Sequence, residues 1–436
     1  MKITTVITAL VLAFATLVAA WPGMAQMAND IRRREGNNQS LELIGDLVGL
    51  HPTALTPVGR RVRNILLAHE SAESDEINTA PHWDTQACAE DTCCVWYHIA
   101  REMAKVFNGD TGICTKQARG AIRLGFHDAA AFSKTKGKGG ADGSIVLVRE
   151  ERDRRLNHGL EGIIAEMEQL HHRWHQFGIS MADLIQMAAT VAAVSCPEGP
   201  RIRSFVGRRD SRRPAPEGLL PDVNDSADTL IRIFRDKTIE PMGLAALLGA
   251  HSVSQQRFVD PSRDGDPQDS TPGVLDTKYY RETLGDAPKR VLKFKSDVLL
   301  SQDPRMFPAF REFSAPEARS QAPWNAAYAR EYVRLSLLGV DNINELADCT
   351  WVLPAANHSG GWKEMNQVVF EEWTDSEGSI PEIADSIRDG ESIDIDIWEM
   401  FAKTRGVRSK LKGLLKKAVK KVKGFWKGVV NKVKGT

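Results

Sequence analysis

The stretch IRLGFHDAAAF, residues 122–132, sets an arginine, a histidine and an aspartate into a small apolar run. The run has the character of a buried helix. Residues four apart share one helix face, so Arg123 and His127 point the same way while Asp128 points elsewhere. A buried arginine and histidine side by side would repel each other if both were charged. We therefore expect His127 to be neutral and an anionic or strongly polar group to lie opposite the pair.

A second histidine, His251, lies in LLGAHSVS near the end of another apolar helical run. A lone histidine there is more often structural than a ligand, but an oxygen-rich loop follows each of the two histidine helices. The first loop is GGADGS at 139–144 and the second is DSTPGVLD at 269–276. Clustered hard oxygen donors are what Ca²⁺ requires. The pattern predicts two calcium sites, with Asp128 completing the first.

The elements that must position these residues read as helices. Apolar residues recur at spacings of three and four through most of the body, which runs from about residue 88 to 354, and Asp225 and Ser226 resemble a helix N-cap. No alternating run demands a large sheet. The predicted fold class is therefore all-α. Helices are expected within 93–107, 117–132, 159–174, 180–194, 225–237, 241–253 and 325–340.

The two ends of the chain differ from this body. Residues 1–20 form an apolar run after Lys2 that ends in small residues, which predicts a secretory signal peptide and an extracellular protein; a membrane anchor is the alternative, and the run is short for one. Residues 21–87 are expected to be an N-terminal extension or propeptide. The basic clusters at 32–34 and 60–61 are either processing sites or solvated charge. Six cysteines in a secreted chain favour three disulfides.

The C-terminal part divides into an acidic segment, 356–400, and a cationic amphipathic helix, 401–436. Residues 371–399 hold eleven Asp and Glu against one Arg, and residues 403–434 hold thirteen Lys and Arg with no acid. Apolar residues in the tail recur at helical spacing. Residues 405–436 are expected to bind an anionic membrane or a cell-wall polyanion, and the alternative is that the helix docks on the acidic segment. Nucleic-acid binding is not expected of a secreted chain.

These motifs together resemble the plant-type haem peroxidase superfamily, and most closely its secreted fungal branch, class II, the group of the lignin and manganese peroxidases. The resemblance rests on RLxFHD at 123–128, GGADGS at 139–144, the histidine helix at 244–253 and DSTPxxxD at 269–276, in the family's order. It covers about 88–354. It implies a peroxidase domain over 88–355, with one haem b between a distal half, about 88–225, and a proximal half, about 226–355.

On the distal side the resemblance implies an acid–base role for His127, which would move a proton between the two oxygens of hydrogen peroxide. Arg123 would stabilise the charge that develops as the O–O bond breaks. Asn157, with Glu151 nearby, would bond His127 and fix its tautomer. Phe126 would pack over the haem.

On the proximal side the resemblance implies that His251 is the iron ligand and that Asp297 accepts its ring N–H. It also implies two calcium ions and three disulfides. The distal calcium ligands would be Asp128, Gly140, Asp142 and Ser144, and the proximal ones Ser252, Asp269, Thr271, Val274 and Asp276. The disulfides would be Cys88–Cys94, Cys93–Cys349 and Cys114–Cys196.

The chain departs from these relatives at two functional sites. Lys116, Gly120 and Arg257 stand where manganese peroxidases carry three carboxylates, so Mn²⁺ has no ligands there. Ala246 stands where lignin peroxidases carry a surface tryptophan. The expected function is a monomeric enzyme that reduces hydrogen peroxide and oxidises phenolic or other small aromatic donors. The alternative is a catalytically weak haem-binding protein whose cationic tail is a membrane-active module.

Overall fold

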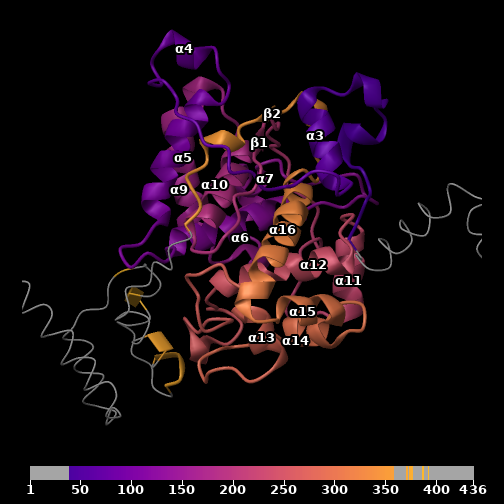
Figure 1. The fold of residues 1–436 in the computed structure, drawn as a ribbon, viewed down its shortest axis with the longest axis vertical. Helices are drawn as coiled ribbons and strands as arrows, with labels where there is room; N and C mark the ends of the chain where they lie inside the picture. Colours follow the sequence, from indigo (N-terminus) through magenta and orange to yellow (C-terminus); the bar gives the residue numbers. More distant parts are fainter. Residues whose placement is uncertain (1–38, 358–369, 372, 377–384, 387–390, 392–436) are drawn as a thin grey trace, which may run out of the picture.

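A computed structural model describes residues 39–357, 370–371, 373–376, 385–386 and 391. Helices dominate this part of the chain (Figure 1), so the all-α prediction is confirmed. The α-helices are α3 Pro57–Leu66, α4 Gln86–Ala89, α5 Cys94–Phe107, α6 Lys116–Ala130, α7 Ser144–Leu147, α8 Arg149–Arg152, α9 Glu161–Trp174, α10 Met181–Ser195, α11 Ala227–Arg235, α12 Pro241–Leu248, α13 Lys278–Leu284, α14 Lys295–Gln302, α15 Phe307–Phe313 and α16 Glu317–Ser336. The 3₁₀ turns are η1 Gly45–Val48, η2 Pro52–Ala54, η3 Arg155–Asn157, η4 His175–Phe177, η5 Gly249–Val253, η6 Pro261–Arg263, η7 Ile343–Glu345 and η8 Thr350–Val352.

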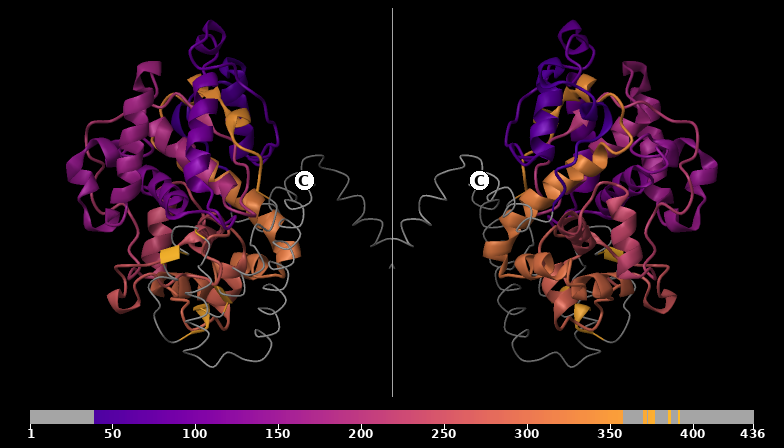
Figure 2. Two further views of the ribbon diagram at one scale, coloured as in Figure 1. Left: turned by 90° about the vertical axis from the view of Figure 1, so that its left-hand side faces the viewer. Right: turned by 90° about the vertical axis from the view of Figure 1, so that its right-hand side faces the viewer.

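The core is built around α10, whose residues are all buried. A helix that is apolar on every side must be surrounded by other elements, and α10 packs against α5, α6 and α9. The helix that carries Arg123 and His127 is thereby fixed along its length. Helix α16, the longest in the described part of the chain, contacts α3 and α6 at one end of the molecule and α12 and α15 at the other (Figures 1 and 2). It ties the two halves together.

Side-chain caps begin the helices on which the site depends. The hydroxyl of Thr115 accepts the Ala118 N–H at the start of α6, and that of Ser226 accepts the Thr229 N–H at the start of α11. Such caps satisfy donors that have no partner inside the helix. The N-cap read from the sequence at 225–226 is Ser226.

One helix boundary differs from the sequence pattern. Helix α16 begins at Glu317 and contains Pro323, whereas the periodicity suggested a start after that proline. A proline inside a helix removes one backbone donor, and burial of Trp324 and Tyr328 on the same helix compensates for that loss. The short helices α13, α14 and α15 were not anticipated, because each is too short for a period to be visible.

Covalent and strand contacts close the distal half. The disulfides are Cys88–Cys94, Cys93–Cys349 and Cys114–Cys196, the same pairs that the resemblance implies. Beside the second, Phe205–Val206 (β1) pairs antiparallel with Ala347–Asp348 (β2). Cys93–Cys349 and the strand pair therefore bring the start and the end of the body together.

The N-terminal segment is part of the same core, which differs from the expected boundary at Cys88. Leu47, Val62 and Ile65 are at most 1% exposed, and they belong to the hydrophobic cluster that contains α10 and α16. From α16, Arg330 and Arg334 donate to the backbone carbonyl of Ser40. The folded body therefore extends back to about residue 39. Helix α3 is amphipathic and needs the rest of the fold to cover its apolar face.

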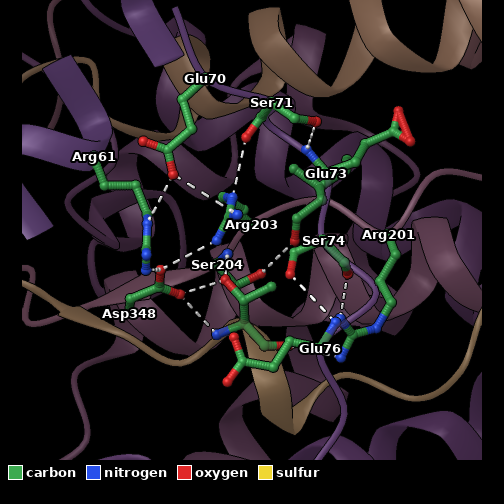
Figure 3. Close-up of polar contacts among 12 residues, drawn as sticks. Arg61, Glu70, Ser71, Glu73, Ser74, Glu76, Arg201, Arg203, Ser204 and Asp348 are labelled. Atoms are coloured by element: carbon green, nitrogen blue, oxygen red, sulfur yellow. Dashed lines mark hydrogen bonds and ion pairs between the residues drawn. The ribbon is translucent and has the colours of Figure 1, made fainter. Parts of the chain in front are cut away.

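Ion pairs hold this segment against the end of the body (Figure 3). Arg61 contacts Asp348 at 2.7 Å and Glu70 at 3.0 Å, and Arg203 lies within 4 Å of the same two carboxylates. The basic pair at 60–61 lies in α3, with Arg61 engaged in this network. Nearby, Arg201 donates to backbone carbonyls of residues 350, 353 and 354. These bonds fix the N-terminal segment against η8.

A short piece of the acidic segment also lies against the body. Phe370 and Trp373 are buried, and the Arg290 guanidinium lies 4.7 Å from the Trp373 ring centroid. The signal peptide, the cationic tail and most of the acidic segment lie outside the described residues. Among the helices that the structure describes, none is by itself long and apolar enough to cross a bilayer.

Candidate active site

Helix α6 presents Arg123 and His127 on one face, one turn apart. The guanidinium Nε of Arg123 donates to His127 Nε2 at 3.3 Å, and its Nη2 donates to the Leu156 carbonyl at 3.1 Å. No residue pattern indicates the Leu156 contact, because a backbone carbonyl from a 3₁₀ turn has no side-chain signature. It fixes the arginine over the histidine.

The tautomer of His127 follows from its second partner. Its Nδ1 lies 2.9 Å from Asn157 Oδ1, while Asn157 Nδ2 donates to the Glu151 carbonyl at 2.7 Å. The second bond fixes which end of the amide is oxygen, so Asn157 can only accept from the ring. Nδ1 therefore carries the proton and Nε2 keeps its lone pair. The Glu151 carboxylate turns away and accepts from the Ala215 N–H.

The electrostatics reinforce this neutral form. Burial, and secondarily the Arg123 charge, lower the pKa of His127 to about 3. Burial also lowers the pKa of Arg123, which stays protonated because its ordinary pKa is so high. The pair therefore consists of a cation beside a neutral base, as the spacing predicted.

His251 lies in η5, directly after α12, and has the opposite kind of partner. Its Nδ1 lies 2.8 Å from Asp297 Oδ2. Asp297 is at the start of α14 and is 1% exposed. Tyr279 and Phe294 meet the imidazole edge-on at 5.8 and 5.5 Å between ring centroids, which sets the plane of the ring. Nε2, on the far side of the ring from Nδ1, is left facing away from the carboxylate.

Burial alone would lower the pKa of His251. The charge and the hydrogen bond of Asp297 outweigh burial, and the pKa of His251 is raised. The carboxylate makes the ring electron-rich, which suits a metal ligand. An imidazole whose Nδ1 is bonded to a carboxylate and whose Nε2 is free to coordinate would suit a ligand of haem iron.

Phe126 precedes His127 on α6 and contacts it. Its ring stacks on Phe234 of α11 at 6.2 Å and meets the ring of His127 edge-on at 5.7 Å. It forms an apolar wall next to the distal base.

The first oxygen cluster gathers at the end of α6. Asp128 is 1% exposed, and its Oδ1 has no hydrogen-bond partner among the described residues. Its Oδ2 accepts from the Gly143 N–H, and Asp142 Oδ1 accepts from the Ser144 N–H. A buried carboxylate oxygen without a donor is costly unless a cation meets it.

Two further observations fit a cation at this cluster. Burial, and then the Asp142 charge, raise the pKa of Asp128 well above its ordinary value. Gly140 has φ of 121°, and a Cβ there would lie 2.2 Å from the Leu338 carbonyl oxygen. Only glycine allows the loop to approach this closely. The donors are oxygen only, which is the chemistry of Ca²⁺.

The second oxygen cluster lies beside His251. Ser252 Oγ and Asp269 Oδ2 are both buried and have no hydrogen-bond partner within the described ranges. Thr271 Oγ1 donates to Asp276 Oδ2 at 3.0 Å, and the Val274 N–H donates to the Thr271 carbonyl. Burial raises the pKa of Asp276 to about 6. Burial, and then the charge of Asp276, raise the pKa of Asp269 well above its ordinary value. This second cluster also has the chemistry of a calcium site.

Two of the residues at which the chain departs from manganese and lignin peroxidases make contacts within the protein. Arg257 lies 4.0 Å from Asp264. Ala246 is fully buried, and its carbonyl accepts from Trp324 Nε1.

An exposed aromatic side chain, Phe258, lies close to Arg123. Phe258 is 61% exposed and meets His158 edge-on at 6.2 Å. A Cβ on Gly159 would lie 3.0 Å from the Phe258 ring and 3.2 Å from Arg123 Nη1. The Phe258 ring and the Arg123 guanidinium therefore approach the same point. The positive φ of Gly159, 86°, explains why a glycine follows Asn157 and His158.

Comparison with known proteins agrees with this geometry. A family model described as Peroxidase matches residues 99–316. Ligninase C of Trametes versicolor is 32% identical over 318 residues, covering 67% of this chain and 81% of that protein. Manganese peroxidase 3 of Phlebia radiata is 30% identical, covering 67% and 83%, and a peroxidase of Arthromyces ramosus is 31% identical, covering 62% and 78%. The chain therefore belongs to the plant-type haem peroxidase superfamily, in its fungal branch, and is a haem peroxidase that acts on hydrogen peroxide.

Proposed function

We propose that this peroxidase reduces hydrogen peroxide with His127 as the acid–base and Arg123 as the charge-stabilising group, and oxidises phenolic or other small aromatic donors by one-electron steps. The observation that carries the proposal is the opposite bonding of two half-buried histidines, one to an amide oxygen and one to a carboxylate. Haem, when bound, supplies the iron that takes up peroxide and the electrons that break its O–O bond.

The distal residues do the proton work. With Nδ1 held by Asn157, the Nε2 lone pair of His127 takes a proton from one peroxide oxygen and returns it to the other, which leaves as water. The Arg123 guanidinium beside it stabilises negative charge on the departing oxygen. Asn157 holds the ring in the tautomer that this transfer needs.

The proximal residues hold the cofactor. His251 binds the iron of a single haem b through Nε2, and Asp297 keeps the proton of Nδ1 bonded. Phe126 packs against the porphyrin on the distal side. Two calcium ions occupy the oxygen clusters, one at Asp128, Gly140, Asp142 and Ser144 and one at Ser252, Asp269, Thr271, Val274 and Asp276.

The reductant is aromatic and not Mn²⁺. Lys116 and Arg257 place cationic groups where a manganese site needs carboxylates. The buried Ala246 offers no aromatic at the position where lignin peroxidases carry a surface tryptophan. Phe258 at the rim, beside Arg123, favours small aromatic donors that stack.

An absorption spectrum tests the catalytic proposal. The haem-loaded protein is mixed with one equivalent of hydrogen peroxide, and recovery is followed with a phenol and, separately, with Mn²⁺. The Soret band should change within the mixing experiment and return with the phenol but not with Mn²⁺. Binding of haem without any spectral change on adding peroxide would favour the alternative, a catalytically weak haem-binding protein.

The cationic tail supports a second function for the secreted enzyme. The thirteen Lys and Arg of 403–434, without an acid and with apolar residues at helical spacing, favour binding to an anionic membrane or a cell-wall polyanion. A synthetic peptide of residues 405–436 should become helical on anionic vesicles and not on neutral ones. If the peptide neither becomes helical nor binds on anionic vesicles, docking of the tail on the acidic segment explains its charge pattern better.

A further inference from the structure

An aromatic corner lies on the surface at the C-terminal end of α9. The ring centroids of Trp83 and Trp174 are 6.2 Å apart, and the two ring planes are at 88°. The ring centroids of Trp83 and Phe177 are 5.9 Å apart, with the planes at 78°. Trp83 is 38% and Phe177 37% exposed. The three rings line an open cavity of about 290 Å³ whose other lining residues are Arg173 and Gln176. Exposed aromatic side chains of this size gathered around a cavity mark a binding surface.

The corner is held in place from two sides. Glu102 of α5 accepts from Trp174 Nε1 at 2.9 Å and from Arg173 Nη2 at 2.5 Å. The loop that carries Trp83 is fastened to the same helix, because His98 Nε2 lies 2.8 Å from the Pro81 carbonyl. The Cys88–Cys94 disulfide closes that loop a few residues later. The walls are therefore preorganised, and a ligand pays little to order them.

The corner is remote from the peroxide chemistry. Helix α9 begins at Glu161, whose carboxylate accepts from Gly159 N beside Arg123, and ends at Trp174. At a rise of 1.5 Å per residue the helix separates its two ends by about 20 Å. A ligand in the corner therefore does not contact His127 or Arg123.

We propose that this aromatic corner is a binding site for a planar aromatic ring that carries a hydroxyl or carboxylate oxygen. Two nearly perpendicular walls let one ring stack on one indole and meet the next edge-on, the two arrangements that aromatic pairs prefer. Arg173 and Gln176 at the rim supply donors for the oxygen substituent.

The test measures binding without peroxide, so it does not depend on the catalytic proposal. 4-Hydroxybenzoate is titrated into the haem-loaded full chain by calorimetry, and the Soret band is recorded in parallel. Binding in the corner should leave the Soret band unchanged. Trp83→Ala should weaken this Soret-silent binding about tenfold, and Trp83→Phe should restore most of it, because an aromatic wall is retained.

Phe307→Ala is the matched control, since Phe307 is 41% exposed on α15 at a different surface. This variant should bind as the parent does. The proposal is overturned if all binding perturbs the Soret band, if Trp83→Ala binds as tightly as the parent, or if no binding occurs up to the solubility of the ligand. Binding of cellohexaose in the corner in place of 4-hydroxybenzoate would overturn the choice of an aromatic ligand.

Discussion

His127 and His251 are both half-buried and have opposite electrostatic surroundings. The distal ring bonds a neutral amide and faces a guanidinium, and its pKa falls to about 3. The proximal ring bonds a carboxylate, and its pKa is raised despite burial. The same side chain is thus suited to carry a proton in one place and to act as an electron-rich ligand in the other. The partner of Nδ1 and the neighbouring charge decide which.

The largest effect should come from removing the distal base. His127→Leu places an apolar side chain of similar size next to Phe126. Leucine has no lone pair to take the peroxide proton. The rate constant for the reaction with hydrogen peroxide should fall by about 10²–10⁴-fold, measured by stopped-flow absorption. Haem content should equal that of the parent, since His251 is untouched. A variant that reacts as fast as the parent would refute the role of His127.

The next largest effect should come from removing the negative charge beside His251. Asp297→Asn keeps the shape of the side chain and removes the charge that raises the pKa of His251. Loss of such a partner typically costs about 10–100-fold in metal affinity or activity. The iron reduction potential should rise, because the ring donates less electron density. Spectroelectrochemistry checks this, with Asp303→Asn, at the other end of α14, as a control. An unchanged potential would mean that Asp297 only positions the ring.

Much of this contrast was readable from the sequence. Arg123 and His127 stand four apart on an apolar helix, so their shared face follows from helix geometry alone. The oxygen-rich loops could be recognised because each cluster is local in the chain. Asn157 and Asp297 lie 30 and 46 residues from their histidines, and only the family resemblance indicated them. The Leu156 carbonyl carries no signal in the side-chain sequence.

Other features were not readable because they depend on tertiary packing. The segment before Cys88 looked like an extension, since its short apolar groups show no core until α16 covers them. The aromatic corner joins Trp83 to residues 174–177 across some ninety positions of sequence. Only the fold, through Glu102 and the Cys88–Cys94 loop, brings these rings together.

A smaller effect should distinguish variants of the two oxygen clusters, because each cluster lies next to a different histidine. Asp128 is adjacent to His127, and Asp269 shares its cluster with Ser252, which is adjacent to His251. Asp269→Ala should therefore speed haem loss to an acceptor protein several-fold, whereas Asp128→Ala should mainly slow the peroxide reaction. Each variant should lose about one calcium ion by elemental analysis. Asp84→Ala, at an exposed carboxylate, is the control, and equal haem loss in both cluster variants would contradict the division.

The smallest effect, a shift in a midpoint, should appear in the pH profile. The folded-state pKa of His127 lies below its ordinary value near 6.5, so the neutral base persists where an unperturbed histidine would be charged. The rate of the peroxide reaction should stay level as the pH falls from 7 towards 4 and decline near 3, when Nε2 takes a proton.

Arg123→Gln should lower the rate and also move this acid limb to higher pH, because the Arg123 charge is the second cause, after burial, of the lowered pKa. The exposed Arg149→Gln is the matched control and should leave the limb where it is. Burial remains in the Arg123 variant, so its limb should stay below the ordinary histidine range. If the limb does not move, burial alone keeps His127 neutral, and the arginine contributes only to charge stabilisation on peroxide.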